Sequence, residues 1–195
     1  ESLRLENPRL IYTAISGFGT QGPLNSAPAY DPVVQAHAGF TAIQGIDNPE
    51  FMRSMICDKI TAYTACQAVT AALLVREKTN EGQHIDISML DSGLFFLFPD
   101  GFMNNTLLDD DVEVRQHIAE IMYNLTETRD GGIIISTATE QHIQGVLRIA
   151  GRDDLLSDPR FASLATLIEN IEEFKEMTKA GFSNMTSEEA MQKLR

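Results

Sequence analysis

The sequence predicts an α/β fold, with part of an open, mostly parallel sheet in its first half and a small α+β domain in its second. An apolar strand-like segment at 10–15 and an alternating one at 84–89 flank a long helical segment at 59–78, which is a strand–helix–strand pattern. Near the other end, a Gly-Gly turn leads into a strand-like segment at 133–136 and helical segments follow. With 195 residues, 43% of them hydrophobic, the chain is long enough for one large domain or two small ones.

The formal net charge of −13 and the two cysteines limit the kinds of partner that we expect. Nucleic acids and anionic membranes are bound by dense Lys and Arg surfaces, so the acidic balance argues against both, although local donors could still hold one small anion. Cys57 and Cys66 provide neither a disulfide framework nor a metal-ligand spacing. We therefore expect no metal site, no membrane span and a cytoplasmic location.

The elements of the first half follow from local patterns. Residues 10–15 are apolar and rich in strand formers, which predicts a buried strand. Asp31 is the expected N-cap of a short helix that has Pro32 at its first position and ends at Gly39. The helix at 59–78 carries apolar residues around much of its circumference, which indicates packing on more than one side.

The middle of the chain changes in character. The segment 94–102 is very apolar, whereas the segment 109–120 is acidic and weakly patterned, as is typical of a connector. We therefore assign residues 1–105 to part of a large domain, 106–122 to a linker and 123–195 to a small domain.

The first element expected in the small domain is the turn Thr128–Gly132, which leads into its strand. Helices are predicted at 140–150 and 168–180. Thr186 and Glu189 have the spacing of a capping box, so a further helix begins close to the last residue of the sequence. Because the sequence also opens without methionine, we expect it to be the middle of a longer polypeptide.

The loop after the first strand carries Gly17, Gly19 and Gly22 in the spacing G-x-G-x-x-G. A dinucleotide-binding fingerprint needs its last glycine inside a helix whose first amides hold the pyrophosphate. Here Pro23 follows the last glycine directly, and no helix is expected before Asp31. The loop is therefore predicted to shape a pocket wall where backbone and ligand approach closely, without binding a pyrophosphate.

Several longer motifs occur in a defined order along the chain. They are N-P-R-L-I-Y at 7–12, S-G-F-G at 16–19, A-Y-D-P-V-V-Q-A at 29–36, R-E-K-T at 76–79, I-D-I-S-M-L-D at 85–91 and D-P-R-F at 158–161. Together they resemble the family III coenzyme A transferases, which include carnitine, formyl-CoA:oxalate and bile-acid enzymes and have α-methylacyl-CoA racemase as a relative. The resemblance covers nearly the whole chain.

The resemblance implies a Rossmann-like CoA-binding domain, a linker and a small domain, assembled as an intertwined homodimer. It implies that CoA and acyl-CoA are substrates, that a carboxylic acid is the acceptor, and that no cofactor is permanently bound. In this family the first strands would lie upstream of Glu1, and a closing segment would lie beyond Arg195.

Asp58 matches the aspartate that the family uses as a covalent nucleophile, at the start of the helix that leads to R-E-K-T. A carboxylate can attack a thioester carbonyl, which forms an acyl-aspartyl anhydride and releases the CoA thiolate. A helix N-terminus also favours a negative charge. From the residues alone, a simple N-cap is the favoured interpretation of Asp58, because aspartates are common at helix starts. The resemblance favours the nucleophile and therefore CoA transfer.

The resemblance also implies that Ala27, Pro28, Ala29 and Tyr30 lie along CoA. Tyr30 could pack on the CoA or merely fill the core. The racemase has a histidine at the position of Tyr30, and an unperturbed phenol, with a pKa of about 10, is a poor base at neutral pH. Transfer is therefore favoured over racemisation, and a non-catalytic CoA-binding fragment is the other alternative.

The remaining polar residues are weaker candidates. Cys57 is expected to be a small buried side chain, and His37 a structural residue. Asp86 and Asp91 are expected to be solvated or turn groups. The formyl-CoA:oxalate enzymes carry a glycine-only loop before the small domain, whereas residues 109–124 contain no glycine, so oxalate chemistry is not supported.

Overall fold

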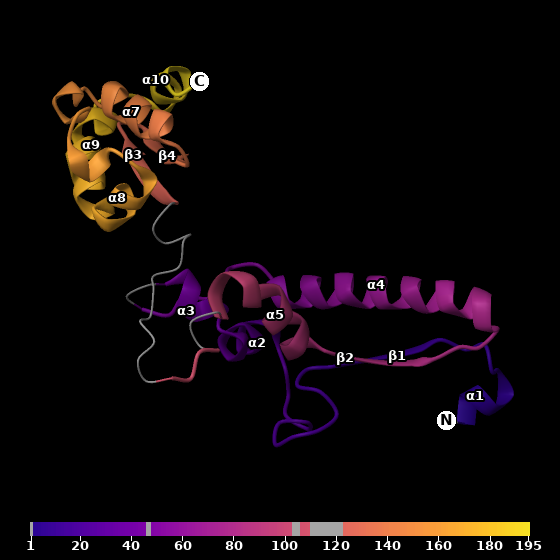
Figure 1. Ribbon diagram of the computed structural model, residues 1–195. Helices are drawn as coiled ribbons and strands as arrows, with labels where there is room; N and C mark the ends of the chain where they lie inside the picture. Colours follow the sequence, from indigo (N-terminus) through magenta and orange to yellow (C-terminus); the bar gives the residue numbers. More distant parts are fainter. Residues whose placement is uncertain (1, 46–47, 103–105, 110–122) are drawn as a thin grey trace. The chain divides into compact units, whose positions relative to one another are not determined.

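The computed structural model divides into two compact units, Glu1–Val114 and Arg115–Arg195, which are described one at a time (Figure 1). The residues that it describes are 2–45, 48–102, 106–109 and 123–195. Most of the expected linker, 106–122, therefore lies outside the described residues. Among the described residues, no helix is both long enough and apolar enough to span a bilayer.

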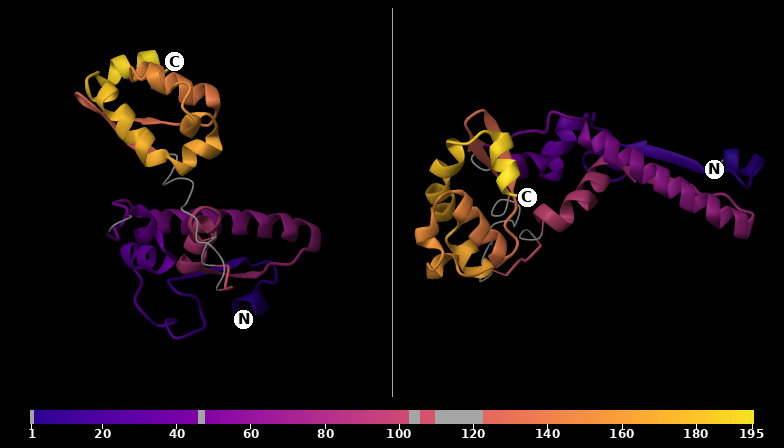
Figure 2. Two further views of the ribbon diagram at one scale, coloured as in Figure 1. Left: turned by 60° about the vertical axis from the view of Figure 1, so that its left-hand side comes forward. Right: turned by 90° about the horizontal axis from the view of Figure 1, so that it is seen from above.

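The first unit is organised around two parallel strands and the long helix that connects them. Its elements are α1 (Ser2–Glu6), β1 (Tyr12–Ser16), α2 (Asp31–Ala38), α3 (Phe40–Gln44), α4 (Ile56–Thr79), β2 (His84–Ser88), α5 (Met89–Leu97) and the π-helical turn η1 (Phe98–Phe102). β1 and β2 pair with Tyr12 opposite His84 and Ser16 opposite Ser88. In each view α4 runs back along the strand pair, so its first turn lies where both strands end (Figure 1 and Figure 2).

The predicted strand–helix–strand unit is confirmed, but two of its details differ from expectation. Helix α4 begins at Ile56, three residues before the expected start. The apolar segment 94–102 spans the second half of α5 and the turn η1. Helix α5 begins directly after β2 because Ser88 caps it, its side-chain oxygen accepting a hydrogen bond from the Asp91 main-chain N–H at 3.1 Å.

The core of the first unit lies where α2, α4 and α5 meet. Its buried apolar side chains are Val34, Ala38, Phe40, Cys57, Ile60 and Leu97. Gly93 of α5 permits this close packing, since a Cβ at that position would lie 3.3 Å from the Ala38 Cβ and 3.6 Å from the Cys57 Sγ. The packing fixes the start of α4 against both neighbouring helices.

Many large apolar side chains of the first unit remain exposed. Tyr63 and Leu74 of α4 are 72% and 65% exposed, and Phe95 of α5 is 84% exposed. The expectation that α4 packs on more than one side is therefore met only in part within the described residues, where its buried residues are Cys57, Ile60, Thr61 and Ala72.

The second unit is a β-hairpin packed against helices. Its elements are β3 (Asn124–Thr128), β4 (Gly131–Ile135), α7 (Glu140–Ile149), the 3-10 turns η3 (Asp153–Leu155) and η4 (Pro159–Phe161), α8 (Leu164–Glu169), α9 (Ile171–Ser183) and α10 (Ser187–Lys193). The strands are antiparallel, with Thr128 opposite Gly131. Strand β3 was not expected, because three of its five residues are Asn or Thr and its segment lacks an apolar run.

The helix expected at 168–180 is in fact two helices. Helix α8 ends and α9 begins at Asn170, whose side-chain amide donates to the Thr166 carbonyl oxygen at 2.8 Å. The capping box before α10 is confirmed: the Thr186 side-chain oxygen accepts from the Glu189 N–H at 3.1 Å, and the Glu189 carboxylate accepts from the Thr186 N–H at 2.8 Å.

The D-P-R-F motif has a structural role in this unit. Asp158 accepts from the Arg160 main-chain N–H at 3.0 Å and forms an ion pair with its guanidinium at 2.7 Å. These hydrogen bonds hold the pKa of Asp158 below its usual value. Arg160 also pairs with Glu173 of α9, and the buried Phe161 ring packs edge-on against Phe174. The motif thus ties the η4 turn to α9.

Candidate active site at the first turn of helix α4

Asp58 lies in the first turn of α4 and is exposed to solvent. The N-cap of this helix is Met55, which makes no capping hydrogen bond with its side chain. An N-cap residue precedes the helix, whereas Asp58 is the third residue within it, so the interpretation of Asp58 as a simple N-cap is wrong. Its carboxylate lies near the positive end of the helix dipole, where a negative charge is favoured.

Asp31 makes the capping hydrogen bond at this helix end from outside the helix. The N-cap of α2 is Tyr30, whose extended backbone (φ −131°, ψ 149°) precedes the helix, so the expectation that Asp31 caps α2 is wrong. Asp31 is already the first helical residue, and its side chain is directed toward α4 instead. Its Oδ2 accepts a hydrogen bond from the Asp58 main-chain N–H at 2.9 Å.

Gln35 supports Asp31 and is fully buried. It lies one turn later on α2, and its Nε2 donates to the Asp31 Oδ1 at 2.5 Å. The same amide nitrogen lies 3.2 Å and 3.1 Å from the carbonyl oxygens of Met52 and Ser54, and Gln35 Oε1 accepts from the Met52 N–H at 2.8 Å. The sequence interpretation missed Gln35; the only local signal was its i,i+4 spacing from Asp31 on a short helix.

Cys57 is buried beside this network. Burial, followed by the negative charges of Asp31 and Asp58, raises the pKa of the Cys57 thiol to about 12. The thiol is therefore protonated at neutral pH, and a protonated thiol is not a nucleophile. The expectation of a small buried side chain is confirmed.

The glycine-rich loop lies against the residues expected to bind CoA. A Cβ added to Gly17 would clash with the methyl group of Ala29, so glycine is required for this close approach. Gly19 and Gly22 have positive φ angles of 85° and 90°. No helix begins between residues 17 and 30, so the loop lacks the helix start that a dinucleotide fingerprint needs, as expected.

The four expected CoA-binding residues form the end of this loop. Pro28 and Tyr30 are exposed, while Ala27 and Ala29 are half-buried. The Tyr30 side chain is 71% exposed, so it does not fill the core of this unit. Its position at the N-cap of α2 places it beside Asp31, which contacts Asp58.

The carboxyl ends of the two strands lie next to this loop. Gly17 directly follows β1, and its carbonyl oxygen accepts a hydrogen bond from the main-chain N–H of Leu90, close after β2, at 3.0 Å. In open α/β sheets, ligands bind in the crevice outside the carboxyl ends of parallel strands. The loop, Tyr30 and Asp58 therefore lie toward this end of the strand pair.

Other candidate residues do not join this group. Asp86 pairs with His84 at 3.3 Å, and Asp91 is exposed in the first turn of α5. His37 is exposed, with its ring edge-on to Phe18 at 5.1 Å between centroids. Among the described residues, no group of three or more His, Cys, Asp or Glu side chains is arranged to hold a metal ion.

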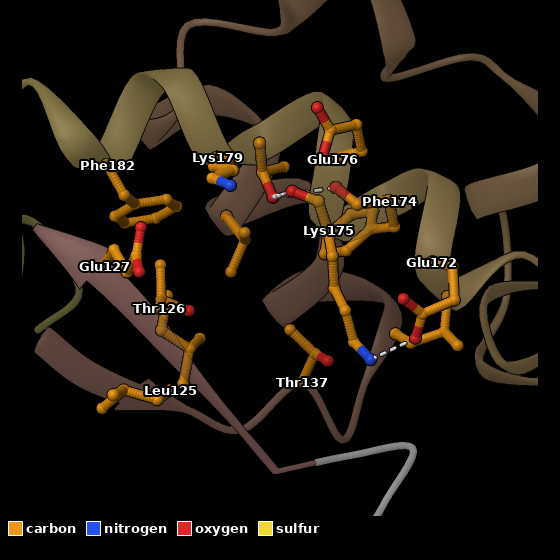
Figure 3. A pocket seen from close by; sticks show the side chains of 14 residues that line it. Leu125, Thr126, Glu127, Thr137, Glu172, Phe174, Lys175, Glu176, Lys179 and Phe182 are labelled. Carbon is orange, nitrogen blue, oxygen red and sulfur yellow. Dashed lines mark hydrogen bonds and ion pairs between the residues drawn. The ribbon is translucent and has the colours of Figure 1, made fainter. Parts of the chain in front are cut away.

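The second unit has a cleft of its own, with a volume of about 330 Å³ (Figure 3). It is bordered by strand β3 and helix α9. Leu125 and Phe182 contribute apolar surface, and the Lys175 ammonium forms an ion pair with Glu172 at 2.5 Å. Side chains of both charge signs and apolar side chains line the cleft together.

Known proteins resemble this chain in sequence and in structure. The sequence model of the family described as CoA-transferase family III matches residues 1–195. A succinate–glutarate CoA-transferase of Agrobacterium fabrum is 32% identical over 168 residues, which cover 84% of this chain and 42% of that protein. An acetyl-CoA:oxalate CoA-transferase of Acetobacter aceti is 30% identical over 83% of this chain and 42% of its own length.

A solved structure is similar over the same extent. A probable fatty acyl-CoA transferase of Mycobacterium tuberculosis is 30% identical in sequence, with 100% of this chain and 52% of that protein covered. A crystal structure of the same protein superposes with a TM-score of 0.81 at 29% identity, covering 98% of this chain and 51% of that one. The chain thus spans about half the length, or less, of these relatives.

Proposed function

The chain belongs to CoA-transferase family III, and on this premise we propose that its protein transfers CoA from an acyl-CoA thioester to a carboxylic acid, with Asp58 as the nucleophile. The relatives described above are CoA-transferases by name, which supports this class of reaction. Their acyl groups and acceptors differ from one another, so the proposal names the reaction class and neither substrate.

The proposed reaction transfers CoA from the donor acyl group to the acceptor acid by way of the Asp58 carboxylate. An Asp58 oxygen attacks the thioester carbonyl, the C–S bond breaks, and a mixed anhydride and the CoA thiolate result. The thiolate then attacks the Asp58 carbonyl, which gives an aspartyl-CoA thioester and releases the donor acid. The acceptor carboxylate attacks this thioester, and the thiolate released attacks the acceptor side of the new anhydride. Acceptor-CoA leaves, and the Asp58 carboxylate is restored.

One observation carries the assignment to Asp58. Its carboxylate is exposed in the first turn of α4, while its own main-chain N–H is held by the buried Asp31 at 2.9 Å. A nucleophile must be accessible to the substrate and also fixed in position. The aspartates at 86 and 91 are exposed too, and the Asp91 N–H is likewise held, by Ser88. Asp58 differs from both in its motif position, at the start of the helix that leads to R-E-K-T.

We further propose that the loop residues Ala27, Pro28, Ala29 and Tyr30 bind CoA. Support comes from the exposure of the Tyr30 ring and from the contact between Ala29 and Gly17 at the carboxyl end of β1. A homodimer in the cytoplasm, with CoA as substrate and no permanently bound cofactor, is part of the same proposal.

The test is a trapping experiment on the full-length protein. Incubation with acyl-CoA and hydroxylamine is expected to convert the Asp58 carboxyl into a hydroxamate, located by peptide mass spectrometry. The variant Asp58→Asn is expected to lose transfer by at least about 1000-fold, because the nucleophile is absent. Its free energy of unfolding should change by less than about 1 kcal/mol, because the side chain is exposed.

The matched control is Asp86→Asn, which removes an exposed carboxylate of the same unit and should retain both transfer and trapping. Transfer by Asp58→Asn, in a sample shown by mass to contain no regenerated aspartate, would refute the assignment. Deuterium uptake beside the thioester without a trapped adduct would instead indicate the racemase-type reaction.

A further inference from the structure

Two buried polar residues of α2 lie close to the start of α4, and the proposed reaction does not use them. Asp31 is 5% exposed and Gln35 is 0% exposed. Burying a carboxylate or an amide is unfavourable unless hydrogen bonds replace those with water. The partners of these two side chains therefore indicate what the pair holds in place.

We propose that Asp31 and Gln35 are positioning residues for the transfer reaction, and this inference rests on the proposed role of Asp58. Both oxygens of Asp31 are engaged: Oδ2 accepts from the Asp58 N–H at 2.9 Å, and Oδ1 accepts from Gln35 Nε2 at 2.5 Å. The two bonds fix the orientation of the Asp31 carboxylate and connect α2 to the main chain of the nucleophile.

Gln35 also holds the segment that leads into α4. Its side chain contacts both main-chain groups of Met52 and the carbonyl oxygen of Ser54, which lie shortly before the first turn of α4. This segment needs an external support because the N-cap Met55 offers no side-chain hydrogen bond to the free N–H groups of the first turn. The buried Gln35 amide thus holds the segment before α4, and the buried Asp31 carboxylate holds the main-chain N–H of Asp58.

The test compares steady-state transfer kinetics and hydroxamate trapping in the full-length protein for Asp31→Ala, Asp31→Asn and Gln35→Met. The last change keeps the length of the side chain but removes every hydrogen bond. We expect kcat for transfer and the rate of Asp58 hydroxamate formation to fall by about 10-fold to 100-fold, while KM for acyl-CoA changes by less than about threefold. Asp31→Asn keeps an acceptor for the Asp58 N–H and should recover part of the rate lost in Asp31→Ala.

The matched control is Gln44→Met, the same change at an exposed glutamine of α3, which should leave kcat unchanged. Rates are measured well below the melting temperature of each variant and are normalised to the folded fraction. If Asp31→Ala does not fold, the kcat values of Asp31→Asn and Gln35→Met test the inference. Folded variants with kcat within about twofold of the parent would overturn the inference, as would equal rates for Asp31→Asn and Asp31→Ala. Activity of Asp58→Asn would instead refute the proposed function itself.

Discussion

At the scale of single residues, Cys57 and Asp58 at the start of α4 differ in their exposure to solvent, and Asp31 of α2 lies close to both. Asp58 is exposed, Cys57 is buried beside it, and Asp31 reaches both from another helix. Adjacent residues in a first helical turn point about 100° apart, so one faces solvent while the next enters the core. This arrangement separates an accessible carboxylate from a protected thiol within two consecutive residues.

The shifted pKa of Cys57 predicts a pH-dependent contribution to stability. The folded-state pKa is raised from 9.0 to about 12, chiefly by burial. Folding therefore favours the protonated thiol, so this contribution is complete below about pH 9 and is lost as the pH rises toward 12. We expect the stability advantage of the parent over Cys57→Ala, measured by urea unfolding, to shrink between about pH 8 and about pH 10.5. A difference that stays constant over this range would contradict the assignment of the raised pKa.

At the scale of elements, the loop between β1 and α2 links the sheet to the candidate site. Ser16 at the end of β1 accepts from the Gly19 N–H at 3.1 Å, which folds the loop back on the strand. Gly17 then contacts Ala29 at the far end of the same loop. A loop that is closed on itself in this way holds residues 27–30 in one defined position. A ligand that binds there does not pay the entropic cost of ordering the loop.

The contact at Gly17 predicts a specific effect of Gly17→Ala. The added methyl group has no room beside Ala29, so the end of the loop must move. We expect KM for acyl-CoA to rise by about 10-fold or more in the full-length protein, with a destabilisation of about 1–3 kcal/mol. Steady-state kinetics and thermal unfolding measure the two effects.

Gly145→Ala is the matched control for this change. Gly145 lies inside α7, and a Cβ at its position would meet no neighbouring atom within 4 Å, so alanine should fit. Because alanine favours helix more than glycine does, the control should gain up to about 1 kcal/mol and leave KM unchanged. Equal KM values for the parent and Gly17→Ala would show that the loop does not contact the substrate.

At the scale of the whole molecule, the two units differ in how much apolar surface they bury. The second unit has a core of eleven buried side chains that include Phe161, Phe174 and Phe182. The core of the first unit has six, although that unit carries the long helix and the parallel strands. Its exposed aromatic residues, such as Tyr63 and Phe95, are the kind of surface that associates with other protein surface.

We therefore expect the 195-residue chain to self-associate through its first unit. Sedimentation at micromolar concentration is the measurement. The variant Phe95→Ser removes a side chain that is 84% exposed, and should reduce association without unfolding the core. The control is Leu108→Ser, which changes an exposed apolar residue of the same unit that lies outside its helices and strands. This change should reduce association less than Phe95→Ser does. A monomer with a cooperative melt would contradict this expectation.

Local patterns in the sequence determined most of the elements. The alternation at 84–89, the apolar run at 10–15 and the helical segment at 59–78 each depend on neighbouring residues, and each indicated the right type of element. The expectation that the first strand is buried is wrong, because β1 contains no buried residue and Ile15 is 55% exposed. The capping box at Thr186 needs only side chains three residues apart. Asp58 was proposed as the nucleophile because its motif context resembles a known family, and the chain belongs to that family.

Only the tertiary structure decided which atoms act on Asp58. Asp31 lies 27 residues from Asp58 in the sequence, and Gln35 lies 17 residues from Met52, so their hydrogen bonds exist only after α2 has packed against the start of α4. The pKa of Cys57 also depends on this packing, because burial and the nearby charges arise together. Local sequence sets the helical and strand preferences of each segment, whereas desolvation and long-range hydrogen bonds depend on which segments meet in space.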